Sequence, residues 1–170
     1  KYNGSIFEIM SAPISAYEIV IGYAGAAVSK SLLISVLILF TSTIFVDFDI
    51  KHPLLMLFLL ILISITFSLF GFIVGIWATN FEKLQLIPLL IITPLVFLGG
   101  SFYSVEMLPE LWQFVTKFNP IFYVINGFRW SFFGTADIAI ITSLSFIIIF
   151  LFICLIVIGL IFKTGYRIKG

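Results

Sequence analysis

The chain has 170 residues, of which 62% are hydrophobic and 10% are charged, and its mean hydropathy is +1.26. Soluble domains are about half apolar and about one quarter charged, so the composition excludes a soluble globular domain and indicates an integral membrane protein. The apolar runs exceed about 18 residues and do not alternate, which predicts helical spans rather than barrel strands. The formal net charge of +1 gives no reason to expect a nucleic-acid partner.

Several kinds of chemistry are excluded by single residue types and missing motifs. Cys154 is the only cysteine and His52 the only histidine, so one chain has neither a disulfide nor a multi-histidine metal site. The sequence contains no GxxxxGK[ST] phosphate loop and no GxSxG nucleophile motif. We therefore predict no catalytic residues, no metal and no cofactor in this chain, and we do not expect it to be an enzyme.

The first 18 residues contain two helix-start patterns. Ser5-x-x-Glu8 and Ser15-x-x-Glu18 both match a capping box, and Pro13 separates them. The first turn is either an interfacial lead-in to a span or a small helix that docks on a soluble partner. The chain begins at Lys1 without a signal peptide, so we expect a fragment whose N-terminal part is missing.

Four apolar segments predict an all-α, polytopic bundle of transmembrane helices, with spans at 19–46, 54–78, 84–103 and 138–162. The third is unusual because Leu84 to Leu98 gives only about 22 Å of helix, which is too short to cross. It must continue through Gly99-Gly100 to Tyr103, or bend at Pro88 and Pro94. We expect this helix to move or to line a path. Asp137 is placed to cap the last span.

Lys30 is a charged residue within the first apolar segment. Counting about 20 residues back from Val46 puts the membrane boundary near Ala27 and Lys30 one turn inside it. Lys30 then either extends outward to the interface or faces inward and lines a polar path.

Residues 99–135, named here the re-entrant segment, predict two short amphipathic helices at one membrane face. An apolar stripe at helical spacing consists of Leu108, Leu111, Trp112, Val115 and Phe118. Pro109 suits the first turn of this helix, and Asn119-Pro120 stops it. A second aromatic helix runs from Ile121 to Phe133 and closes at Gly134.

Arg129 is the charge of most interest in the re-entrant segment. It lies beside aromatic residues such as Trp130 and has three possible roles. It could touch lipid headgroups, contact a substrate directly, or form an ion pair with one of the three nearby carboxylates, Glu106, Glu110 or Asp137.

Basic residues predict the orientation of the bundle. Four spans place both chain ends on one side, which carries Lys1, Lys83, Lys163, Arg167 and Lys169, with Lys30 near it. The other side carries Lys51, Lys117 and Arg129. This bias predicts cytoplasmic ends, a cytoplasmic tail at 163–170 and an external re-entrant segment.

The order of these motifs resembles the permeases of ABC-2 type transporters. The resemblance rests on Phe97-Leu98-Gly99-Gly100-Ser101-Phe102-Tyr103, Leu108-Pro109, Trp112, Asn119-Pro120, Tyr123 and Gly127-Phe128-Arg129. The stretch from Glu8 through Ser11 to Pro13 is similar to the piece that precedes the third span in that family. The Phe81-Glu82-Lys83 loop and the Gly165-Tyr166-Arg167 tail are also similar.

The resemblance implies the permease subunit of an ATP-driven exporter in a bacterial inner membrane, carrying a drug, a lipid-linked molecule or a saccharide. It implies a dimer of permeases in lipid with separate ATPase subunits that bind the ATP. Residues 5–13 would be a cytoplasmic coupling helix, with Ser5, Glu8, Ser11 and Pro13 as coupling residues. The external gate would comprise Gly99, Gly100, Phe102, Tyr103, Pro109, Trp112, Pro120, Tyr123 and Arg129. A nucleotide-independent channel or membrane scaffold is the alternative.

Overall fold

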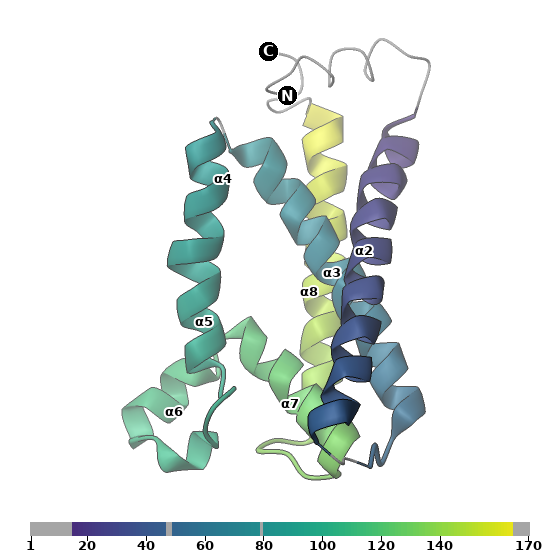
Figure 1. Ribbon diagram of the computed structural model, residues 1–170. Coiled ribbons are helices and arrows are strands. Elements are labelled where there is room, and N and C mark those ends of the chain that lie inside the picture. The colour runs from purple at the N-terminus through teal and green to yellow at the C-terminus, as the bar shows by residue number, and fades with distance from the viewer. Residues whose placement is uncertain (1–14, 47–48, 79, 165–170) are drawn as a thin grey trace.

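The computed structural model describes residues 15–46, 49–78 and 80–164. These residues form helices joined by short connections, with no strand among them, so the predicted all-α membrane fold is confirmed. Figure 1 shows that α2 begins and α8 ends at one end of the bundle, and that α6 and α7 lie towards the other end. The coupling residues Ser5, Glu8, Ser11 and Pro13 and the tail at 165–170 lie outside the described residues.

Three helices are each long and apolar enough to cross a membrane: α2 (Ala16–Phe45), α3 (Pro53–Trp77) and α8 (Ile140–Thr164). The predicted capping box opens α2, because the Ser15 N–H donates to Glu18 Oε2 at 2.7 Å and the Glu18 N–H donates to Ser15 Oγ at 3.3 Å. Pro53 occupies the first position of α3, where its missing N–H costs no helical hydrogen bond.

The third apolar segment forms a composite helical rod, which consists of α4 (Phe81–Ile87), a π-helical turn η1 (Pro88–Ile92) and α5 (Thr93–Leu98). Pro88 and Pro94 lack the N–H groups of a regular α-helix, and the Thr93 N–H reaches back to the Pro88 carbonyl. The rod is about 27 Å long. It ends at Leu98, so the expected continuation of the helix to Tyr103 is wrong: Gly99 and Gly100 form a turn.

The re-entrant segment contains a short 3-10 turn, η2 (Val105–Met107), followed by α6 (Glu110–Thr116) and α7 (Pro120–Phe133). Asn119 caps α7, Pro120 is its first residue, and Gly134 ends it in the left-handed conformation with φ 70°. These are the two short helices that the sequence predicts. The last span begins at Ile140, so Asp137 lies too early in the chain to cap it. The expected capping role is wrong.

The centre of the bundle is α3, which packs against α2, α7 and α8. One apolar cluster joins Leu59 and Leu62 of α3 to Ile147 of α8, and a second joins Leu69 to Cys154 and Ile158. The rod stands apart from this core and contacts it through α5 and α7. Gly71 and Gly75 of α3 have no other helix within 4 Å of an added Cβ, so they support no close helix approach inside the described chain.

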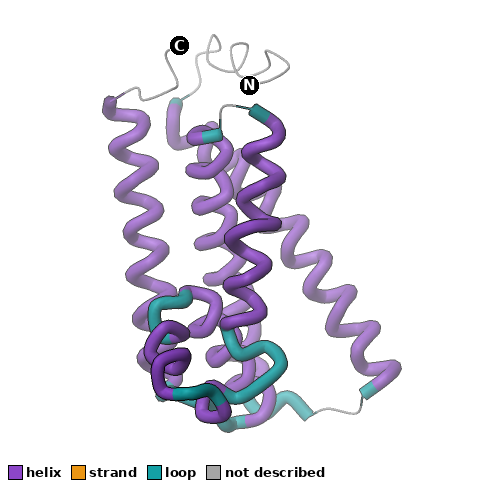
Figure 2. Tube along the Cα trace, turned by 90° about the vertical axis from the view of Figure 1, so that its left-hand side faces the viewer, coloured by secondary structure: helices purple, strands orange, loops and turns teal. Residues whose placement is uncertain are grey.

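The register of α2 against α3 places Lys30 deeper than the sequence suggests. Ser31 Oγ lies 3.0 Å from Ser64 Oγ, and Ser64 lies near the middle of α3. This register argues for a position deeper than one turn inside the boundary. The count back from Val46 assumed an upright helix, whereas Figure 2 shows α2 inclined to the other long helices. A long apolar helix accommodates its extra length by tilting.

Candidate gating site

The turn after the rod brings α7 against the end of α5. A Cβ added at Gly99 would lie 2.9 Å from Ile125 Cδ1 and 3.0 Å from the Leu95 carbonyl oxygen. Gly100 has φ 83°, a conformation that side-chain-bearing residues rarely adopt. Glycine is therefore required at Gly99 because neighbouring atoms leave no room for a side chain. It is required at Gly100 because of the left-handed backbone conformation.

The hairpin between α6 and α7 satisfies the free carbonyls at the end of the rod. Asn119 Nδ2 donates to the Leu95 carbonyl at 2.6 Å. The Thr116 hydroxyl lies 2.9 Å from the Trp112 carbonyl oxygen of its own helix and 3.4 Å from the Leu98 carbonyl oxygen, so its bond to Leu98 is the weaker of the two. The last carbonyls of a helix have no partner within it. Both hairpin side chains are buried. The tip of the hairpin is therefore fastened beside the last turn of α5 by polar contacts.

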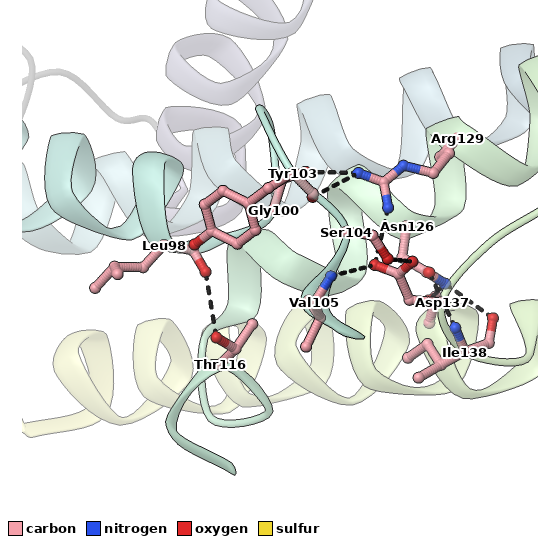
Figure 3. Close-up of polar contacts among 11 residues, drawn as sticks. Leu98, Gly100, Tyr103, Ser104, Val105, Thr116, Asn126, Arg129, Asp137 and Ile138 are labelled. Carbon is pink, nitrogen blue, oxygen red and sulfur yellow. Dashed lines mark hydrogen bonds and ion pairs between the residues drawn. The ribbon is translucent and has the colours of Figure 1, made fainter. Parts of the chain in front are cut away.

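Arg129 is the hub of the site (Figure 3). Its Nη1 lies 2.8 Å from Asp137 Oδ2, and its Nη2 donates to the carbonyls of Gly100 at 2.6 Å and Tyr103 at 3.3 Å. The side chains of Arg129 and Asp137 are 24% and 12% exposed, so the pair is largely shielded from solvent. Of the three roles that the sequence allows for Arg129, the structure shows the ion pair and selects Asp137 as its carboxylate.

Asp137 holds the other side of the same turn. Its Oδ1 accepts from Ser104 Oγ at 2.8 Å, and its Oδ2 accepts from the Val105 N–H at 3.2 Å. Charge-assisted hydrogen bonds of this kind are about twice as strong as neutral ones. We name Arg129, Asp137 and the bonded groups of residues 100–105 the arginine clamp. It connects α7, the turn after the rod and the segment that leads into α8.

A second polar contact joins α7 to the start of α8. Asn126, 1% exposed, donates from Nδ2 to the Ile138 carbonyl at 3.1 Å and to Ser143 Oγ at 2.9 Å. Its Oδ1 accepts from the Ile138 N–H at 3.2 Å. One buried amide thus satisfies both backbone groups of Ile138. Neither Asn126 nor Asn119 is among the predicted gate residues, and the Asn119-Pro120 pair predicted only a helix end.

The far end of α7 is attached to the connection between α2 and α3. The Lys51 N–H donates to the Phe132 carbonyl at 3.3 Å, and the His52 N–H donates to the Ser131 carbonyl at 2.9 Å. The His52 ring stacks on Trp130, with ring centroids 4.1 Å apart. The whole length of α7 is therefore held by neighbouring segments.

The remaining predicted gate residues are spread over the segment. Tyr123 donates from its hydroxyl to the Lys117 carbonyl at 2.7 Å and stacks on Phe146 at 4.0 Å between ring centroids. Phe102 is exposed and stacks on Phe97. The Tyr103 hydroxyl is buried without a hydrogen-bond partner in the described part of the chain.

Pro109 and Pro120 act at helix starts, and Trp112 is exposed on α6. The clamp therefore unites Gly100, Tyr103 and Arg129 from the predicted set, but not Trp112. Among residues 15–46, 49–78 and 80–164, no group of three or more His, Cys, Asp or Glu side chains could hold a metal ion.

Comparison with known proteins identifies the family. Residues 2–133 match the family model described as ABC-2 type transporter. The chain belongs to the ABC-2 type transporter family. It is a multi-pass protein of the inner membrane, as its long apolar helices and the location of its relatives indicate.

The similar curated proteins carry the name inner membrane transport permease YadH. Those of Escherichia coli K12, Escherichia coli O157:H7 and Shigella flexneri are each 35% identical over 151 residues, which cover 89% of this chain and 59% of the relative. The chain thus spans about three fifths of the length of these relatives. No solved structure matches it.

Proposed function

We propose that the chain is part of the permease subunit of an ATP-driven exporter. Support comes from its membership of the ABC-2 family and from the permease name of relatives 35% identical to it. In this proposal two permease copies in the lipid bilayer work with a separate ABC ATPase, which binds and hydrolyses the ATP. Drugs, lipid-linked molecules and saccharides are the candidate cargoes.

The arginine clamp is the observation that carries the gating proposal. It fastens the re-entrant segment through side-chain contacts, with Arg129 bonded at 2.8 Å to Asp137 and at 2.6 Å to Gly100. Such side-chain contacts can be exchanged for contacts with water or cargo when the segment moves. A segment joined to its neighbour as one continuous helix could not separate in this way. In our proposal the described arrangement is the closed state of an external gate formed by residues 99–135.

The composite rod is our candidate for the element that moves. Its end is bonded to the gate chiefly through the Leu95 carbonyl, while its π-helical turn at Pro88–Ile92 interrupts the regular helical hydrogen-bond pattern. Kinks in helices occur at such turns and at prolines. Movement of the rod would pull directly on the tip of the α6–α7 hairpin. Coupling by this route needs an element with two arrangements.

Residues 5–13 supply the proposed coupling helix, which the ATPase would press on when it binds ATP. Replacing Glu8 with Lys, or Pro13 with Leu, is expected to weaken ATPase attachment and to uncouple hydrolysis from substrate. Glu110→Lys is the matched control, because it reverses an exposed charge on α6, in the re-entrant segment.

The deciding experiment is purification of the full-length protein from native membranes in detergent, with ATPase assay and mass identification of what accompanies it. The proposal expects an ATPase with a phosphate loop, whose attachment is reduced by Glu8→Lys and Pro13→Leu but not by Glu110→Lys. A stable self-oligomer that purifies alone and shows no response to nucleotide would contradict it and favour a channel or scaffold.

A further inference from the structure

Lys30 lies at the middle of the membrane-crossing bundle. Its neighbour Ser31 pairs with Ser64 at 3.0 Å between the hydroxyl oxygens. At 1.5 Å per residue, Ser64 is roughly 16 Å from the first residue of α3, Pro53, and roughly 20 Å from the last, Trp77. The hydrocarbon core is about 30 Å thick, so this level is close to its midplane.

The lysine side chain is too short to reach either membrane surface from this depth. Its four-carbon stem spans little more than one helical turn, about 5.4 Å. Neither end of α3 is within that reach of Ser64. The outward-extended position that the sequence allowed is therefore excluded by the α2–α3 register.

No counter-charge for Lys30 exists in the described chain. Its side chain is exposed and makes no hydrogen bond or ion pair there. The described carboxylates all lie in the first turn of a helix or in the segments of chain that connect the long helices. They are Glu18, Asp49, Glu82, Glu106, Glu110 and Asp137. A second copy of these residues would likewise bring no carboxylate to the midplane. An ammonium group left in hydrocarbon is costly, so it must face water or an anion.

α2 is the least apolar of the three long helices. Its candidate span has a mean hydropathy of 1.9, against 2.8 for α3 and 3.4 for α8, although α2 is the least covered of the three. A helix that faces lipid is expected to be the most apolar one. The exposed residues of α8 meet that expectation, namely Ile149, Phe152, Ile153, Leu155, Ile156 and Leu160. The exposed residues of α2 are more mixed: most are apolar, such as Leu33, Val36, Leu37 and Phe40, but they also include Ser29, Lys30, Thr41 and Thr43.

We propose that the exposed surface of α2 around Lys30 lines the transport path and that Lys30 binds an anionic group of the cargo, a phosphate or a carboxylate, at the midplane. The inference rests on the proposed transport function and narrows its cargo to molecules that carry negative charge. The ammonium group would attract such a group into a region of low dielectric constant, where a single charge acts strongly.

The test measures charge preference without knowing the cargo. Cys154 is replaced by Ala, and Ala27, one turn from Lys30 and exposed, is replaced by Cys as a reporter. The full-length protein with its ATPase in proteoliposomes is treated with a sulfonate-bearing or a trimethylammonium-bearing methanethiosulfonate. Each rate is divided by the rate of the same reagent with a free thiol, because a thiolate in solution reacts faster with the cationic reagent. We expect this normalised rate to be about tenfold higher for the anionic reagent, as focused charge in a cleft produces. Lys30→Gln should bring the ratio of the normalised rates to about one.

The control is Ile149→Cys on α8, an exposed position beside Ile147, which packs at the level of Leu59 and Leu62. It should not react with either reagent. Four results would overturn the inference. The reporter at Ala27 could be inert, or it could react at equal normalised rates with both reagents. It could also keep its preference in Lys30→Gln, or react no faster than Ile149→Cys. ATPase attachment and activity are measured in the same samples. Their retention alongside a failed reporter rejects the Lys30 inference alone, whereas their absence rejects the proposed ATP-driven function.

Discussion

Arg129 Nη1 lies 2.8 Å from Asp137 Oδ2, and the two residues belong to different sides of the turn that follows α7. The guanidinium also bonds the Gly100 and Tyr103 carbonyls, while the carboxylate bonds Ser104 and the Val105 N–H. A contact between residues close in sequence thus fixes a loop about 30 residues earlier in the chain. This relationship is the basis of the proposed closed gate.

Breaking the clamp from either side should loosen the re-entrant segment. Arg129→Gln and Asp137→Asn each leave a mostly shielded charge without its partner, and we expect each to lower the free energy of unfolding by about 1.5–3 kcal/mol. The double variant should cost less than the sum, because neither charge is then left alone. Thermal unfolding in detergent, with limited proteolysis of residues 99–135, measures this. Additive losses would contradict a direct pair.

The two glycines of the turn should differ in how they respond to alanine. Gly100→Ala places a side chain at φ 83° and is expected to cost about 1–2 kcal/mol. Gly99→Ala collides with Ile125 Cδ1, so adding Ile125→Val should restore part of the loss. Gly75→Ala is the control, since nothing lies within 4 Å and alanine favours a helix. Equal thermal stability of all three variants would refute the described turn.

Asn126 should be intolerant of an apolar substitute of similar size. Asn126→Leu leaves the N–H and carbonyl of Ile138 and the Ser143 hydroxyl without their partner. The expected loss is about 1–3 kcal/mol for a buried unsatisfied group. Ser143→Ala removes only one of these bonds and should cost less. Unfolding midpoints in detergent give the comparison, and a harmless Asn126→Leu would show that α7 and α8 meet differently.

The α2–α3 register can be checked with a disulfide. Ser31→Cys with Ser64→Cys, in a Cys154→Ala background, should cross-link rapidly under mild oxidation, because the hydroxyl oxygens are 3.0 Å apart. Ser31→Cys with Ser68→Cys is displaced by one turn and should cross-link poorly. Electrophoresis with and without reductant reports the yield. A preference for the Ser68 pair would show that Lys30 lies away from the midplane.

Local signals in the sequence predicted where the helices begin and end. Ser15 and Glu18, Asn119-Pro120 and Gly134 are short-range patterns, and each marks a helix end in the structure. The end of the rod could not be predicted, because the sequence allows a helix to continue through Gly99 and Gly100. The turn depends on the left-handed conformation of Gly100 and on the contact of Gly99 with Ile125.

Contacts between distant segments were less predictable. Sequence spacing allowed Arg129 three carboxylate partners and cannot choose among them, since the choice depends on how the turn folds back. Asn126 lies in a helix with no pattern around it, and its partners at Ile138 and Ser143 follow only from the α7–α8 packing. The depth of Lys30 could not be predicted, because it depends on the inclination of α2. The length of the apolar segment does not determine that inclination.

The most direct test of the gate is the reactivity of Thr116, a residue 2% exposed at the hairpin tip. In a Cys154→Ala background, Thr116→Cys is treated with a water-soluble maleimide in the complex with its ATPase, without nucleotide and with a non-hydrolysable ATP analogue. Phe118→Cys, at a position 71% exposed, is the control and should react quickly in both conditions. We predict slow labelling of Thr116→Cys that accelerates when the analogue binds, and no acceleration in Glu8→Lys. An equal rate with and without the analogue would contradict a gate opened by the ATPase.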